Sequence, residues 1–248
     1  MPRLVPFRLA AACALALVFV LGAAAAIAKG PVVNLRVVGK GGKVLAERSL
    51  TAGATSIVPS PKATCLGAGT GGSGHSVKVK GGTALGVLAK ASKSTAGLKP
   101  LLVTDHYIAE FGMGVCGVGQ SKATSKLSWY LKVNHKGSQR GGEQTKVRAG
   151  DEVLWALAPY PYPNELSLSA PASAEAGKPF TVTVVSYDEK GKKKPASGVT
   201  VTGAAAATDA EGHASVVLTE PAKLIARDSV DIPSNQVAVC IGGACPAG

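Results

Sequence analysis

Hydrophobic and polar residues alternate most regularly in the stretch 128–134, near the middle of the chain. Alternation with a period of two predicts a half-buried β-strand, because successive side chains of a strand point to opposite faces. The apolar face is expected to carry Trp129, Leu131 and Val133, and the polar face Tyr130, Lys132 and Asn134.

Ala149-Gly150-Asp151 then forms a turn, and the chain returns in a second strand that contains Trp155. Both tryptophans of the chain lie in this pair of strands. Since aromatic side chains on alternating strands are most often core residues, we expect Trp129 and Trp155 to be buried. Tyr130 and Asn134 are then expected to face solvent.

The same kind of pattern predicts one helix and further strands between residues 31 and 158. Residues 31–50 are expected to form a β-hairpin that turns at a glycine-rich segment. Residues 82–91 are the best helix candidate, because Thr83 can cap the first turn and apolar residues recur at helical spacing. We therefore expect an α+β domain of the β-grasp type over residues 32–158, with one helix packed across a mixed sheet.

From residue 164 onwards the pattern changes to short strands only. The strongest is 180–185, and others follow at regular spacing as far as residue 241. This spacing predicts an immunoglobulin-like β-sandwich over residues 165–241, followed by a tail at 242–248. Alternating prolines make 159–164 a stiff, extended linker that spaces the two domains. The expected fold class is therefore mainly β.

The first 28 residues have the features of a signal peptide. Arg3 and Arg8 supply a positive start, residues 9–27 are almost entirely apolar, and Ala26-Ile27-Ala28 ends in the small-x-small pattern of a cleavage site. The alternative is an uncleaved anchor, since the apolar run is just long enough to span a bilayer. We favour cleavage, after Ala28 or alternatively at Ala24-Ala25-Ala26, which predicts a secreted chain with no stable membrane insertion.

The charge of the chain is strongly basic. Without Arg3 and Arg8 the 27 basic residues become 25, against 15 acidic residues, so the mature chain carries a net charge of +10. One cluster stands out, Lys190-Gly191-Lys192-Lys193-Lys194. It fits contact with an anionic cell wall or polyanion, but a solvated loop tip is the interpretation we favour. Nucleic-acid binding is not expected, because no basic stretch is interleaved with aromatic residues.

Four cysteines remain after cleavage: Cys65, Cys116, Cys240 and Cys245. An even number in an exported chain predicts disulfides, and three pairings are open. We favour Cys65–Cys116 and Cys240–Cys245, because each pair stays within one predicted unit. The chain-entropy model gives about 4 kcal/mol for the longer loop and about 2 kcal/mol for the shorter one. A metal site is not expected, because no Cys-x-x-Cys or paired-histidine spacing occurs.

Two short motifs resemble the transcobalamin-like C-terminal domain family. They are Trp-Tyr-Leu-Lys-Val-Asn at 129–134 and Gly-Asp-Glu-Val-Leu-Trp at 150–155, joined by a glycine-rich connection through Gly137, Gly141 and Gly142. The resemblance covers about residues 32–158, and the predicted helix falls where that family places its helix. One departure is His135, where the family commonly has glycine.

The resemblance implies a binding function of limited definition. In vertebrate cobalamin carriers the related domain covers one face of the corrinoid, whereas bacterial members occur in exported proteins. By motif, the ligand-binding candidates are Trp129, Tyr130, Asn134 and Trp155. No resident cofactor is expected, and cobalamin is the one ligand that the resemblance brings into consideration. Residues 165–241 resemble, at the level of fold, the bacterial immunoglobulin-like modules that serve as spacers or adhesive units.

Known catalytic motifs are missing from the sequence. There is no Gly-x-Ser-x-Gly, no evident pair of carboxylates and no free thiol expected beside a histidine. The glycine-rich stretch 67–74 fits either a lid or a plain surface loop, and we favour the loop. We therefore expect a secreted, non-enzymatic binding or cell-surface interaction protein with an unknown extracellular or cell-envelope ligand. The alternative is a small-ligand carrier, corrinoid or otherwise, and a hydrolase with an unassigned triad is a distant third.

Overall fold

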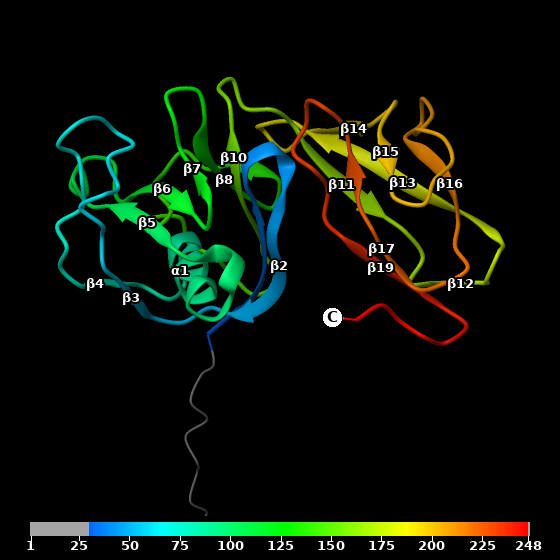
Figure 1. Cartoon of the computed structure of the whole chain (residues 1–248), viewed down its shortest axis with the longest axis horizontal. Coiled ribbons are helices and arrows are strands. Elements are labelled where there is room, and N and C mark those ends of the chain that lie inside the picture. The colour runs from blue at the N-terminus through cyan, green and yellow to red at the C-terminus, as the bar shows by residue number, and fades with distance from the viewer. Residues whose placement is uncertain (1–29, 248) are drawn as a thin grey trace, which may run out of the picture.

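The computed structural model describes residues 30–247, so the predicted signal peptide lies outside the described residues. The fold is mainly β, as expected, and one α-helix occurs between residues 30 and 247. No helix in that range is both long enough and apolar enough to span a membrane. The molecule has two halves that lie side by side, one formed around α1 and the other containing strands β11 to β19 (Figure 1).

The first half is organised around a five-stranded mixed sheet with the strand order β2-β1-β10-β8-β9. Strands β1 and β10 run parallel, and the other neighbours are antiparallel. The strands are β1 (Val32–Val38), β2 (Val44–Thr51), β8 (Ser128–Val133), β9 (Lys136–Gly137) and β10 (Glu152–Ala158).

Two smaller sheets and two 3-10 helices complete this half. One sheet pairs β3 (Thr55–Ile57) with β4 (Val77–Val79). The other joins β5 (Leu101–Thr104), β6 (Gly114–Val118) and β7 (Ser121–Lys122). The 3-10 helices are η1 (Lys40–Gly42) and η2 (Ala96–Leu98).

Helix α1 (Ala84–Ser94) packs on one face of the five-stranded sheet. Thr83 caps it as expected, since its hydroxyl accepts a hydrogen bond from the Gly86 amide at 3.3 Å. Lys93 lies in the last turn, where the helix dipole favours a cation. The apolar side of the helix meets β1, β8 and β10 in one core, which includes Leu85, Leu88, Leu35, Leu131 and Trp155.

The second half contains short strands in several small sheets around a separate apolar core. The largest sheet has four antiparallel strands: β11 (Glu165–Ser169), β13 (Pro179–Tyr187), β14 (Lys193–Pro195) and β16 (His213–Val217). The smaller sheets comprise β12 (Ser173–Ala174) with β19 (Val237–Ile241) and β17 (Ala222–Leu224), and β15 (Thr200–Val201) with β18 (Ala226–Arg227).

A third apolar cluster joins the two halves. Ile232 from the second half packs with Val38, Leu154 and Tyr130 on the sheet face opposite to α1. Tyr162 from the predicted linker stacks on Tyr130, with ring centroids 3.9 Å apart and planes within 10°. Because of these contacts the segment 159–164 does not hold the halves apart, and the expectation of an extended spacer is corrected.

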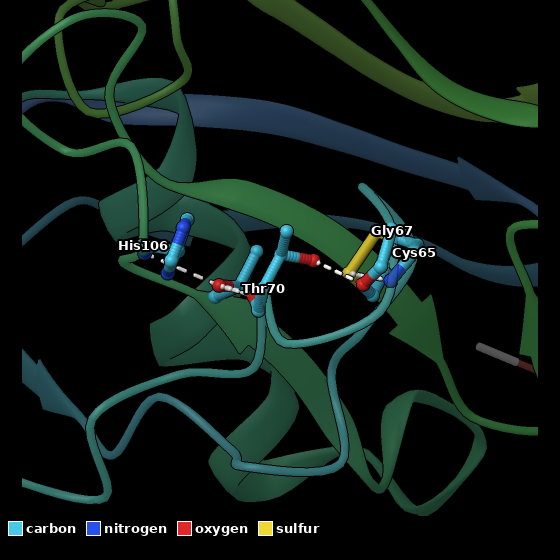
Figure 2. Close-up of a disulfide and its surroundings, with 6 residues drawn as sticks. Cys65, Gly67, Thr70 and His106 are labelled. Carbon is cyan, nitrogen blue, oxygen red and sulfur yellow. Dashed lines mark hydrogen bonds between the residues drawn. A yellow bond between two sulfur atoms is a disulfide. The ribbon is translucent and has the colours of Figure 1, made fainter.

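Both disulfides have the pairing favoured from the sequence. Cys65 bonds to Cys116 and Cys240 to Cys245. Two disulfides fit an oxidising compartment outside the cytoplasm. Beside the first one, the glycine-rich stretch 67–74 is fixed by side-chain hydrogen bonds (Figure 2). Thr70 donates to the Gly67 carbonyl at 2.7 Å, and its own carbonyl accepts from Thr104 at 2.5 Å. This stretch is therefore a structured loop.

Candidate functional site

The four sequence-predicted ligand residues do not form one site. Trp155 is buried in the core under α1, where its Nε1 donates to the Ala84 carbonyl at 3.4 Å. Gly142 packs so closely against the Trp155 ring that a Cβ there would come within 2.7 Å of it. Trp155 also borders a surface groove, but it is only 3% exposed, so it is chiefly a core residue, as expected.

Asn134 lies away from the other three and has a role in a turn. Together with His135 it forms the two-residue loop between β8 and β9, and both residues have positive φ, at 49° and 67°. Positive φ at both positions is the pattern of a type I′ hairpin, which normally selects Asn-Gly. The Asn134 side chain bonds to the Asp151 carboxylate and to the Glu152 amide, each at 2.9 Å. Asn134 is exposed, as expected, but its polar groups are occupied.

Trp129 and Tyr130 lie together at the border of an aromatic groove. Strand β9 pairs only with Lys132 and Val133, so the beginning of β8 is an edge of the sheet. Both side chains reach this edge, although they belong to opposite faces of the strand. The groove has a volume of about 420 Å³ and is lined by Trp129, Tyr130, Tyr160, Tyr162, Ser138, Gln139, Arg140 and Glu189, among others.

Three tyrosine rings of the groove form a connected set. Tyr162 stacks on Tyr130, and its hydroxyl lies 3.0 Å from the Ser128 hydroxyl. Tyr160 meets Tyr162 edge to face at 5.6 Å and is 82% exposed. The groove therefore presents one fully accessible ring beside rings that are held in place by their neighbours. The expectation that Tyr130 faces solvent is wrong, since it is only 4% exposed, and Tyr162 covers it.

Two residues that line the groove each have a buried polar atom without a hydrogen-bond partner among residues 30–247. These atoms are Nε1 of Trp129 and the hydroxyl of Tyr130. Gly137 lies directly beside that hydroxyl, since a Cβ at residue 137 would collide with it. Burial, followed by the negative charge of Glu189, raises the pKa of Tyr130, so its hydroxyl keeps its proton at neutral pH. Buried donors without partners are uncommon and indicate a place where a ligand or water accepts a hydrogen bond.

Arg140 lines the groove, and further basic side chains lie on two segments next to it. The loop 188–192 of the second half contacts the hairpin at 134–137, because the Gly137 amide donates to the Glu189 carbonyl at 2.8 Å and Gly191 packs on Lys136. The Asp188 carboxylate holds the loop by accepting from the amides of Lys190 and Lys192 at 2.9 and 2.8 Å. We refer to the exposed residues Lys136, Arg140, Lys190 and Lys192 as the basic rim.

A buried charge cluster fixes the second half against the first. Glu165 on β11 is 2% exposed, and its carboxylate contacts Arg36, Lys132 and His135 of the first half. The Lys132 Nζ lies 3.1 Å from one carboxylate oxygen, and the His135 Nδ1 lies 3.2 Å from the other. His135 also stacks on Tyr187, with ring centroids 3.8 Å apart.

One carboxylate serves two cations and His135 in this cluster. Burial on its own would raise the pKa of Glu165, but His135, Arg36 and Lys132 together lower it to about 2. Burial lowers the pKa of Lys132, while the Glu165 carboxylate opposes that change. A cavity of about 280 Å³ lies next to the cluster, bordered by Glu47, Glu152 and Asn235. Its lining mixes both signs of charge, so it shows no preference for one class of ligand.

Within residues 30–247 no three His, Cys, Asp or Glu side chains are grouped so as to hold a metal ion.

Tyr160, Tyr162, Glu189 and the basic rim were not among the sequence-predicted site residues. Two sequence signals pointed toward them: the tyrosine pair in the linker, and the lysine cluster at 190–194, for which contact with a polyanion was the interpretation not favoured. No protein-family model, curated protein or solved structure matches the chain.

Proposed function

We propose that this protein is a secreted, non-enzymatic binding protein of the cell surface or its surroundings, and that the aromatic groove is its ligand site. In this proposal the first half is a β-grasp module of the transcobalamin-like type and the second is an immunoglobulin-like module. Export is supported by the signal-like residues 1–28 and by the two disulfides.

The observation that carries the proposal is the pair of unpartnered buried donors in a groove with an exposed aromatic ring. Ligand sites combine apolar and aromatic walls with a few polar groups that fix orientation, and they occur preferentially where domains meet. This groove has residues from the sheet edge, the linker and the second half. The buried charge cluster keeps these three parts in a fixed arrangement, which reduces the entropic cost of binding.

A corrinoid carrier is the second candidate, because three of the four ligand candidates taken from the family-like motifs, Trp129, Tyr130 and Trp155, line the groove. The two candidates share one site and differ in the ligand. The oxidised chain from Lys29 is therefore tested in two assays, equilibrium dialysis against cobalamin and co-sedimentation with insoluble peptidoglycan. Saturable binding in either assay is the expected result.

The variant Tyr160→Ala removes the exposed ring of the groove and is expected to weaken binding about tenfold. Trp129→Phe keeps a ring but removes the Nε1 donor, and it tests the unpartnered donor directly. Val230→Ala is the control, since Val230 is also exposed and apolar but lies outside the groove. Binding that is the same in Tyr160→Ala as in the unmodified chain contradicts the proposal, and retention of neither cobalamin nor peptidoglycan excludes these two ligands.

A further inference from the structure

We propose that the aromatic groove binds the pyranose rings of an acidic glycan, with the basic rim contacting its carboxylates. This inference rests on the proposed function and specifies the ligand class of the same groove. Three features carry it: the accessible ring of Tyr160, the unpartnered donors of Trp129 and Tyr130, and the four cations of the basic rim.

The first feature fits the shape of a sugar ring. A pyranose has a face of C–H groups that is apolar and nearly flat, and an aromatic side chain buries such a face without unsatisfied polar atoms. Tyr160 projects one such surface, and Tyr162, edge to face with it, gives the groove a second wall. The volume of about 420 Å³ is within the range of pockets that bind small ligands.

The second feature fits the oxygen atoms around a sugar ring. The Trp129 Nε1 is a donor only, and the Tyr130 hydroxyl keeps its proton, so both need acceptors. Hydroxyl and ring oxygens of a pyranose supply acceptors at the edge of an apolar face. Sugar hydroxyls also donate, and Gln139 and Glu189 in the groove wall supply acceptors for them.

The third feature selects an acidic glycan over a neutral one. Arg140 lines the groove, Lys136, Lys190 and Lys192 are exposed on the hairpin and the loop beside it, and the mature chain has a net charge of +10. A positive region attracts a polyanion and increases its rate of association, in a manner that salt weakens. Glu189 is the one acidic side chain in the groove lining, so the carboxylates of the glycan are expected at the rim and its hydroxyls within the groove.

A proline-rich peptide is the competing occupant, because aromatic grooves also bind polyproline helices. Its backbone carbonyls can accept from Trp129 and Tyr130. However, prolyl residues have no N–H groups, so such a peptide leaves Gln139 and Glu189 without donors and the basic rim without a counter-charge. The observations therefore favour the glycan.

Isothermal titration calorimetry of the oxidised chain tests the inference with defined probes. These are tetragalacturonate and a hyaluronan tetrasaccharide as acidic pyranosides, cellotetraose as a neutral one, poly-L-glutamate as a polyanion without sugar, and decaproline. At least one acidic tetrasaccharide is expected to bind about tenfold more tightly than cellotetraose and poly-L-glutamate.

Variants assign the binding to the groove and its rim. Tyr160→Ala is expected to lower the affinity for the acidic tetrasaccharide about tenfold. Tyr160→Phe keeps the ring and is expected to keep the affinity. The double variant Lys136→Ala/Lys190→Ala is also expected to lower this affinity and to make the affinity less dependent on salt. Val230→Ala is expected to bind like the unmodified chain.

The contrary outcomes are distinct. If poly-L-glutamate binds as tightly as the acidic tetrasaccharides, or if decaproline binds and they do not, the glycan inference is overturned. If neither tetrasaccharide binds while cobalamin or peptidoglycan is retained in a Tyr160-dependent manner, the inference fails and the proposed function stands. If nothing binds in any of these assays, both fail.

Discussion

The two faces of the five-stranded sheet are both covered, but by different kinds of contact. On the face toward α1, Leu35 and Leu131 pack in a continuous apolar core. On the face toward the second half, the neighbouring residues Arg36 and Lys132 are also buried, and they contact the Glu165 carboxylate. One residue step along β1 or β8 thus leads from an apolar core to a buried ion cluster.

The comparison shows that these faces obtain stability in different ways. The apolar face gains from burial in proportion to the area removed from water, and it tolerates changes that preserve volume. The charged face has to offset the cost of removing ions from water, and it does so only while every charge has its partner. We expect this buried ion cluster to contribute more to the geometry of the junction than to net stability.

The largest effect is expected from breaking the charged face. Glu165→Gln leaves Arg36 and Lys132 buried without a counter-charge, and it is expected to lower the free energy of unfolding by about 3–5 kcal/mol. Urea denaturation at pH 7, followed by tryptophan fluorescence and circular dichroism, measures the change. Glu175→Gln, on an exposed residue of the second half, is the matched control.

A companion variant sharpens the result. The triple replacement Arg36→Leu/Lys132→Leu/Glu165→Leu removes all three charges and is expected to recover most of the lost stability, because no buried charge remains unpaired. Equal urea midpoints for Glu165→Gln and Glu175→Gln would show that the cluster does not hold the halves together.

The apolar face is tested by Leu35→Ala, one residue from Arg36. Leu35 is fully buried under α1, so its truncation is expected to cost about 2–5 kcal/mol through lost burial and the cavity left behind. The same denaturation assay measures this cost at pH 7 and at pH 4, and we expect the same value at both. Val32→Ala on the same strand is exposed and serves as the control, with an effect of less than about 0.5 kcal/mol.

Lowering the pH is expected to reduce the stability contributed by the charged face and to leave that of the apolar face unchanged. The pKa of Glu165 in the folded protein is about 2, below its ordinary value of 4.5. The ionised Glu165 carboxylate therefore stabilises the folded state fully above about pH 5, and this contribution is lost as the pH falls toward 2. Its upper limit is about 3 kcal/mol of the free energy of unfolding. Because Glu47 and Asp231 have raised pKa values, the informative quantity is a difference between variants.

We expect the stability difference between the unmodified chain and Glu165→Gln to narrow as the pH is lowered from 7 to 3. The difference for Leu35→Ala is expected to stay constant over the same range. Urea titrations at five pH values provide the measurement. If the stability difference between the unmodified chain and Glu165→Gln does not change with pH, the cluster does not hold the Glu165 carboxylate in its ionised form.

Much of the apolar side of this fold could be predicted from the sequence. Alternation placed Trp129, Leu131 and Val133 on one face, Thr83 marked the start of α1, and the spacing of the cysteines favoured the observed pairing. These features are local, because they depend on periodicity, capping and loop length.

The sheet face toward the second half depends on contacts between distant segments of the chain, and local sequence patterns do not indicate such contacts. Tyr130 and Lys132 have the alternation of solvent-facing residues, yet the linker and the second half cover Tyr130, and the second half covers Lys132. Tyr160 and Glu189 reach the groove only because the linker and the loop 188–192 contact the first half. Polar alternation identifies a second face, but it does not show whether water or another domain covers that face.

The smallest expected effect concerns His135, which connects the turn to the charged face. A left-handed backbone costs a residue with a Cβ about 1 kcal/mol, and His135→Gly removes that cost. Glycine also makes the unfolded chain more flexible, which costs about 0.5–1 kcal/mol, so the two backbone effects nearly cancel. What remains is the loss of the ring that stacks on Tyr187 and contacts Glu165, and we expect a net destabilisation of about 1 kcal/mol.

A double-mutant cycle with Tyr187→Leu isolates the stacking contribution, because it compares His135→Gly with and without the partner ring. If stacking accounts for the loss, His135→Gly is nearly neutral in the Tyr187→Leu background. An unchanged effect in both backgrounds would assign the loss to the carboxylate contact. Either result explains why a residue that a type I′ turn disfavours is retained here: its side chain contacts the second half, which glycine cannot do.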